Sequence, residues 1–269
     1  MLKNIFKNIV INSTILFVIA AIAETIMHES GHFIAGILVH AKEVTLFHNY
    51  VSDNADNLSL SESIFIKGAG PFVSLFIGVL FHFICSRQKE RGLTFLFNLY
   101  MSVFGYIGML GYLMIAPIFT YGDTGYICKA LNFPLWLTVT LALAGAFLLY
   151  LLMRILVRYF VEMATKEIAE TKELRSHFIA SLVFYPVLLG IVISTLLNLP
   201  VPTFASLIAP ICSPFTILWT YRNALSQKYP GDKMSMDITS VNKINYKWVI
   251  VFVLTIVVNR YLVTGFSIR

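Results

Sequence analysis

The sequence predicts an all-α membrane protein with about six to seven transmembrane helices and a small β-hairpin between the first and second helices. Hydrophobic residues make up 58% of the 269 positions and charged residues only 13%, whereas soluble domains carry about 25% charged residues. Apolar stretches of roughly 20 residues, the length that crosses a bilayer as a helix, recur from the first residues to the last. We therefore expect residues 1–269 to form one integral membrane domain.

The first apolar span runs from about Ile9 to about Leu38 and is interrupted by polar residues from Glu24 onward. The apolar region of a cleaved signal peptide is shorter, so we expect this span to be retained. We expect the later spans at about Gly70–Cys85, Leu93–Thr120, Leu135–Leu156, His177–Leu199, Phe204–Thr220 and Trp248–Thr264. The sixth span contains Pro210 and Pro214, so we expect it to be kinked or re-entrant.

A polar stretch after the first span has the composition of a β-hairpin. Lys42–Tyr50 and Leu58–Lys67 are rich in β-branched and aromatic residues, which favour strands. Between them, Ser52–Asn57 is a turn-forming cluster. We therefore expect a hairpin over about 42–67, at the membrane surface or sheltered by helices, because an open sheet edge cannot face lipid.

The distribution of charge predicts an orientation and the kind of partner. The net charge is +6, but Lys and Arg lie in short loops between apolar spans, so we expect a lipid bilayer and no nucleic acid as partner. If every expected span crosses the bilayer, most of the 20 basic residues lie on the side of the N terminus, which the positive-inside rule places in the cytoplasm. The 3 cysteines are widely separated and lack CxxC spacing, so we expect neither a disulfide framework nor a thiolate metal site.

The end of the first span carries a metal-binding motif. Residues 27–33 read MHESGHF, which contains the HExxH pattern. Residues four apart share one face of a helix, so His28 and His32 can bind one metal ion while Glu29 approaches a water that the metal activates. We expect one Zn²⁺ held by the two histidines, with Glu29 as the general base. Glu24, one turn earlier, either accepts a hydrogen bond near the metal or has a helix-entry or packing role.

A catalytic zinc site needs a third protein ligand. Asp123 stands apart, because it follows an apolar span and lies between Gly122 and Gly125, which let backbone come close to a metal. The same glycines also fit a simple turn around an N-capping aspartate. The other candidates are the remaining histidines and acidic residues of polar runs: His40, His48, His82, His177, Asp53, Asp56, Asp232, Asp237 and the Glu162–Glu173 group.

Together these residues resemble the site-2 protease family of intramembrane zinc metalloproteases. The resemblance covers roughly Leu16–Ile127 and rests on MHESGHFIAGILVHAKEVTLF, on the AGP of Ala69–Pro71 and on the glycine-flanked Asp123. Family members place HExxH in a transmembrane helix, follow it with a surface hairpin and an AGPxxN element, and take a third ligand from an aspartate in a later NxxPxxxxDG-like segment. The resemblance therefore implies Asp123 as third ligand, a catalytic core at 1–130 and additional transmembrane helices at 131–269. It also implies hydrolysis of peptide bonds in transmembrane or signal-like segments of a membrane-protein substrate.

The chain departs from the family pattern in two places. AGPxxN reads AGPFVS here, so Ser74 stands where asparagine is usual; the resemblance gives Gly70, Pro71 and Ser74 a role in binding the substrate strand. The later segment reads MIAPIFTYGDTG over Met114–Gly125, keeping Pro117 but lacking the usual asparagine. A substrate strand unwound from its helix would find backbone partners at the hairpin edge.

Two other functions stay open. Prenyl-protein-processing zinc peptidases also carry HExxH in a membrane protein and take their third ligand from a downstream glutamate, which would be Glu167 or Glu170 here. A non-enzymatic membrane scaffold or transporter would keep a structural or vestigial metal site, although a structural zinc has no use for Glu29. The hairpin and the AGP element favour the site-2 protease interpretation.

Overall fold

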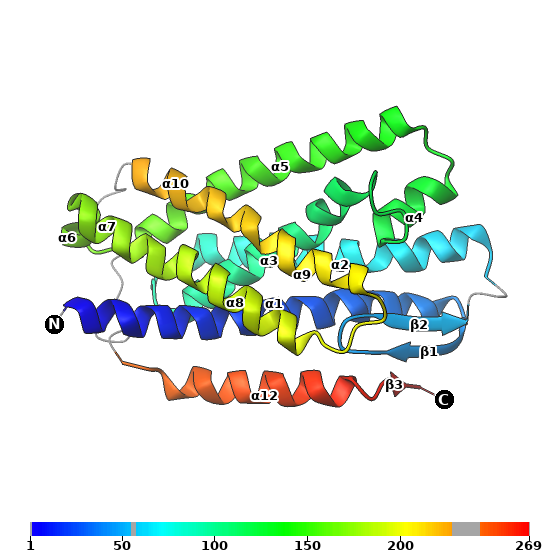
Figure 1. Cartoon of the computed structure of the whole chain (residues 1–269), viewed down its shortest axis with the longest axis horizontal. Helices are drawn as coiled ribbons and strands as arrows, with labels where there is room; N and C mark the ends of the chain where they lie inside the picture. Colours follow the sequence, from blue (N-terminus) through cyan, green and yellow to red (C-terminus); the bar gives the residue numbers. More distant parts are fainter. Residues whose placement is uncertain (1, 55–57, 228–242, 269) are drawn as a thin grey trace.

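The computed structural model describes residues 2–54, 58–227 and 243–268. Its long helices run side by side along one axis, with the N terminus at one end and the C terminus at the other (Figure 1). Helix α1 (Leu2–Leu38) lies among them and contacts α2, α3, α8 and α12. Within these described ranges, five helical segments are long and apolar enough to cross a membrane: Phe6–Leu38, Leu60–Arg87, Leu93–Ile115, Leu135–Glu162 and Lys172–Leu197.

Helix α2 (Leu60–Arg87) begins earlier than predicted. Ser59 and Glu62 form a capping box, in which the Glu62 N–H donates to Ser59 Oγ (3.3 Å) and the Ser59 N–H donates to the Glu62 carboxylate (2.7 Å). This reciprocal pair satisfies two backbone donors at a helix start. The prediction of a strand at Leu58–Lys67 is therefore wrong, because the cap outweighs the β-propensity of the residues that follow it.

A β-hairpin connects α1 to α2, but its strands are β1 (Lys42–Leu46) and β2 (Val51–Asn54). The turn lies between them and is closed by a 2.9 Å hydrogen bond from the Phe47 N–H to the Tyr50 carbonyl. The two aromatic rings stack with their centroids 4.4 Å apart. The turn predicted at Ser52–Asn57 is wrong in its first part, which belongs to β2, and the rest of it lies outside the described residues.

A third strand, not foreseen from the sequence, completes the sheet. β3 (Phe266–Ser267) pairs antiparallel with β1, which gives the strand order β2-β1-β3. The C-terminal segment is thereby fastened to the hairpin. Strand β2 stays on the outside of the sheet, with one edge unpaired by the other two strands.

Helix α3 (Leu93–Ile115) forms much of the core. It contacts α1, α2 and α5 (Leu135–Glu162), and its side chains are buried along most of its length. Tyr100 of α3 packs edge-on against Phe17 of α1, with ring centroids 5.5 Å apart. These contacts hold α3 beside the half of α1 that precedes the HExxH motif.

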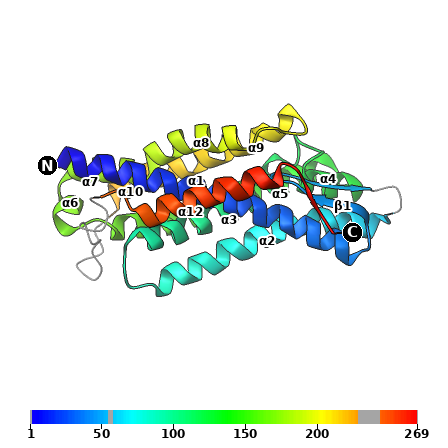
Figure 2. The ribbon, with the colours of Figure 1, turned by 90° about the horizontal axis from the view of Figure 1, so that it is seen from below.

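The second half of the chain adds further helices. After α5, the chain forms α6 (Lys166–Glu170), α7 (Lys172–Ile179), the π-helical turn η2 (Ala180–Phe184) and α8 (Tyr185–Leu197). The helix expected to be interrupted at Pro210 and Pro214 is broken into η3 (Phe204–Leu207), α9 (Ile208–Cys212), η4 (Ser213–Ile217) and α10 (Leu218–Ser226). Helix α12 (Tyr246–Leu262) then runs beside α1 (Figure 2).

Basic residues gather at the end of the bundle that holds the N terminus. Helices α2 and α5 both finish at this end (Figure 1), where Arg87 lies in the last turn of α2 and Arg158 near the end of α5. Helices α6 and α7 lie there too and contribute Lys166 and Lys172. The hairpin and α4 (Asp123–Ala130) occupy the opposite end.

We predict that the N-terminal end faces the cytoplasm, because of this concentration of positive charge. In a background without Cys85, Cys128 and Cys212, a Ser52→Cys variant in β2 should react with a membrane-impermeant maleimide in intact cells. A Lys89→Cys variant, between α2 and α3, should react only after the cells are opened. Labelling of the second variant in intact cells, with the first protected, would reverse the orientation.

Candidate metal centre

Three buried side chains from distant parts of the chain meet at one point. His28 and His32 lie one turn apart on α1, and Asp123 is the first residue of α4. The two Nε2 atoms are 3.1 Å apart, and Asp123 Oδ2 lies 3.1 Å from His28 Nε2 and 3.2 Å from His32 Nε2. Atoms bound to one tetrahedral zinc at about 2.0–2.1 Å lie roughly 3.3 Å from one another. These three residues can therefore hold a metal ion.

In both imidazoles, Nδ1, the nitrogen that faces away from the other ligand atoms, donates a hydrogen bond. His32 Nδ1 lies 2.7 Å from the carbonyl oxygen of Ile66, which only accepts, so Nδ1 carries the proton. In a neutral ring, Nε2 then presents a lone pair toward the other ligand atoms. A single proton can bridge one pair of the converging atoms, whereas a metal cation satisfies all three.

The Nδ1 atom of His28 also carries a proton, because it is the donor in a chain of hydrogen bonds. The hydroxyl of Ser74 on α2 donates to Glu24 Oε1 at 2.5 Å. Ser74 Oγ therefore accepts the hydrogen bond from His28 Nδ1, at 2.8 Å. A carboxylate that orients a ligand histidine fixes its tautomer and raises its basicity. Of the two roles considered for Glu24, the geometry supports the hydrogen-bond acceptor.

Two glycines make room for this arrangement. A side chain at Gly70 would collide with the Nε2 atoms of both histidines, and one at Gly108 of α3 would collide with Glu24 and Ser74. Gly70 and Ser74 thus lie directly against the ligands, and Pro71 is buried beside them in α2. None of these three residues predicted to bind substrate lines the two cavities described below.

The start of α4 positions Asp123. The N-cap is Gly122 rather than the aspartate, so Asp123 does not serve as an N-cap. Gly125 allows α4 to pack against the carbonyl of Phe119, and Thr124 Oγ1 donates to the carbonyl of Tyr112 on α3 at 2.7 Å. Burial opposes ionisation of Asp123, but charge and hydrogen-bond interactions with His32 and His28 outweigh it and hold the pKa of its carboxyl below the usual range. This effect needs positive charge beside the carboxyl, which protonated imidazoles or a bound cation would supply. The side chain is therefore a carboxylate, as metal binding requires.

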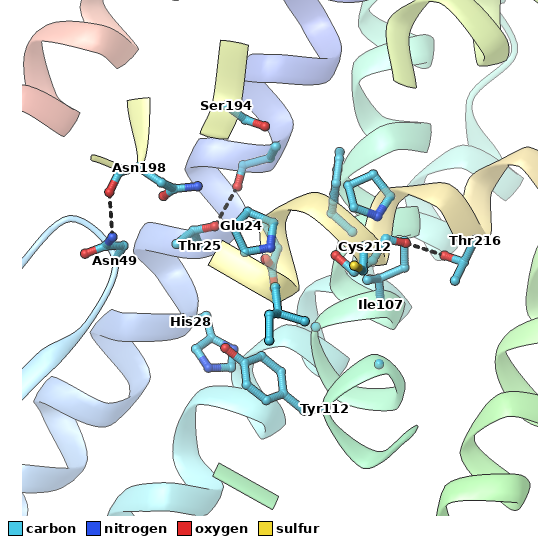
Figure 3. A pocket seen from close by; sticks show the side chains of 18 of the residues that line it. Glu24, Thr25, His28, Asn49, Ile107, Tyr112, Ser194, Asn198, Cys212 and Thr216 are labelled. Carbon is cyan, nitrogen blue, oxygen red and sulfur yellow. Dashed lines mark hydrogen bonds between the residues drawn. The ribbon is translucent and has the colours of Figure 1, made fainter. Parts of the chain in front are cut away.

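Two cavities flank the centre, and Glu29 lines both. The first, about 220 Å³, is mostly apolar and lies between α1, α3, α8 and the interrupted helix, as the positions of Glu24, Ser194 and Cys212 show (Figure 3). The second, about 310 Å³, lies between β2, the start of α2 and α4, and also contains Lys67. A group bound at the metal centre would thus reach space on two sides.

The other candidate ligands lie apart from this centre. His48 Nε2 donates to the carbonyl of Asn198 at 2.9 Å; burial and the Arg260 guanidinium outweigh this bond and lower the pKa of His48. Among the described residues, the remaining candidates form no group with three metal ligands. His82 pairs with Tyr106, Glu162 pairs with Arg91, and Glu167 and Glu170 are exposed on α6. Asp56, Asp232 and Asp237 lie outside the described residues.

One residue beside the centre was missed in the sequence analysis. Tyr112 of α3 stacks on the His28 ring, with centroids 5.2 Å apart and the planes inclined by 18° (Figure 3). It lines both cavities. No local pattern singles out this tyrosine, because its position depends on how α3 packs against α1.

The comparisons with known proteins give no match: no protein-family model, no curated protein and no solved structure is similar to this chain. The resemblance to site-2 proteases therefore depends on the motif residues, and the interpretation of the centre depends on its geometry.

We predict that Ser74→Ala weakens binding of added Zn²⁺ by roughly 10- to 100-fold, because removal of a group that orients a ligand histidine has this effect. Competition with a chromophoric chelator would measure it. The matched control is Ser102→Ala, which removes another buried hydroxyl, bonded to the carbonyl of Gly78. Equal zinc affinity in Ser74→Ala and the wild type would remove Ser74 from the centre.

Proposed function

We propose that this protein is an intramembrane zinc metalloprotease of the site-2 protease type, which hydrolyses peptide bonds in transmembrane or signal-like segments. The observation that carries the proposal is the convergence of His28, His32 and Asp123 in a bundle of apolar helices, with Glu29 in the wall of both adjoining cavities. Ionisable groups cost roughly 2.5–3.5 kcal/mol each at the centre of a transmembrane helix, so such a cluster favours a functional role.

The donor set favours zinc. Two imidazole nitrogens and one carboxylate oxygen leave a fourth tetrahedral position free, which is the arrangement of catalytic rather than structural zinc sites. Calcium and magnesium prefer sites made of oxygen ligands alone. When bound, zinc would polarise the scissile carbonyl and lower the pKa of the attacking water.

Glu29 supplies the acid–base step. Its carboxylate takes a proton from the attacking water as the oxygen adds to the carbonyl carbon. The carbon–nitrogen bond then breaks, and Glu29 returns the proton to the leaving amine. One water is consumed, and the products are a carboxylic acid and an amine, which become a carboxylate and an ammonium group once the acid's proton passes to the amine.

The two cavities suggest how an apolar segment is held. A helix hides its own carbonyls, so the substrate must unwind before it is cut. Tyr50, Val51 and Asp53 line the second cavity, and the outer strand β2 can pair with an extended substrate backbone. The apolar first cavity suits the hydrophobic side chains of the same segment.

The alternatives have less support. The glutamates that the prenyl-peptidase interpretation requires, Glu167 and Glu170, lie on α6, at the end of the bundle away from the hairpin and α4 (Figure 1). A scaffold with a structural metal would not need Glu29 beside the ligands or cavities on both sides of it. We therefore favour proteolysis.

We predict that Glu29→Gln retains zinc but cleaves a single-span peptide of about 20 apolar residues at least 100-fold more slowly, since general-base catalysis contributes about 10²–10⁴. Zinc content and cleavage in detergent micelles would be measured on the same preparations. Glu170→Gln, which changes an exposed glutamate of α6, should match the wild type.

The same variant can identify natural substrates. Membrane fragments that copurify with Glu29→Gln but not with the wild type are expected to be uncut single-span segments. Loss of zinc from Glu29→Gln would make this residue a ligand and contradict the proposed role. Full cleavage by a zinc-containing Glu29→Gln protein would contradict it as well.

A further inference from the structure

Tyr112 occupies the junction of the two cavities. Its ring lies almost parallel to the imidazole of His28 (Figure 3). Its side chain shares the walls of both cavities with Glu29, Asn49 and Ile115. A group that extends from the metal centre into either cavity therefore enters a space that Tyr112 lines.

The hydroxyl of Tyr112 is available for a ligand. The other tyrosines of α3 use theirs: Tyr100 donates to the carbonyl of Leu182 at 2.6 Å, and Tyr106 pairs with His82 at 3.0 Å. Within the described chain the Tyr112 hydroxyl has no hydrogen-bond partner, and it is not sealed from solvent. A tyrosine hydroxyl without a protein partner, at a place that a ligand can reach, can donate a hydrogen bond to that ligand.

Peptide hydrolysis is faster when a hydrogen-bond donor beside the metal centre faces the carbonyl oxygen of the substrate. When water adds to the carbonyl carbon, the carbonyl oxygen becomes an oxyanion, and a preorganised donor stabilises this charge. The carboxylate of Asp123 can only accept hydrogen bonds, and the proton that Glu29 has taken from the water is the one it must deliver to the leaving amine. Lys67 lines only the second cavity, and Asn49 Nδ2 gives one of its two N–H groups to the carbonyl of Asn198 at 2.8 Å. Tyr112, in contrast, lines both cavities and stacks on His28.

We propose that Tyr112 is a catalytic hydrogen-bond donor to the oxyanion of the tetrahedral intermediate. This proposal rests on the proteolytic function proposed above. The phenol keeps its proton throughout and forms no covalent bond. Stacking on His28 limits where the tyrosine ring can move. The contact that orients this histidine therefore also orients the phenol.

Tyr112→Phe tests the hydroxyl alone, because phenylalanine keeps the ring on His28. We expect unchanged zinc content, a kcat for the single-span peptide lower by roughly 100-fold, and a KM within about twofold of the wild type. A phosphinic pseudopeptide, whose anionic phosphorus group imitates the tetrahedral intermediate, should bind Tyr112→Phe at least about tenfold more weakly. Tyr106→Phe removes a hydroxyl elsewhere on α3 and should leave all of these quantities unchanged.

The binding measurement does not depend on cleavage. A wild-type protein that binds zinc and the phosphinic pseudopeptide but cuts no peptide would contradict the proposed function, while the affinities would still decide the role of Tyr112. Equal affinity of Tyr112→Phe and the wild type for the pseudopeptide would overturn the proposal. Loss of zinc from Tyr112→Phe would also overturn it, because the hydroxyl would then support the metal site itself.

Discussion

The arrangement of the first half of the molecule depends on one constraint: His28 Nε2, His32 Nε2 and Asp123 Oδ2 converge within 3.2 Å inside an apolar bundle. Three such acceptors can share one metal ion, and the side chains around them orient them toward one another. Ser74 and the carbonyl of Ile66 hold the outer nitrogens of the rings. Burying so many polar atoms is costly unless each has a hydrogen-bond partner or a metal ion.

Elements distant in sequence serve this centre together. Helix α1 supplies the two histidines and the proposed base, α2 supplies Ser74, and α3 supplies Tyr112 and the space at Gly108. The interrupted helix helps to close the first cavity. The carbonyl of Asn198, the C-cap of α8, accepts hydrogen bonds from His48 and Asn49 of the hairpin turn. These two hydrogen bonds link the hairpin to the second half of the chain at the wall of the first cavity.

The histidine pair was predictable because helical periodicity brings residues four apart onto one face. Asp123 was predictable from glycines after an apolar span. The start of α2 was missed although Ser59 and Glu62 carry a readable capping signal, since β-branched residues nearby suggested a strand. Strand β3 and the contact of Tyr112 with His28 depend on packing between segments far apart in sequence, which no local pattern encodes.

X-ray absorption at the zinc edge tests the metal centre most directly. The zinc-loaded protein should show only nitrogen and oxygen neighbours at about 2.0–2.1 Å, with multiple scattering from two imidazoles. In Asp123→Ala the zinc content should fall, because two protein ligands bind zinc more weakly than three. A sulfur neighbour at about 2.3 Å, or full zinc occupancy in Asp123→Ala, would contradict the centre described here.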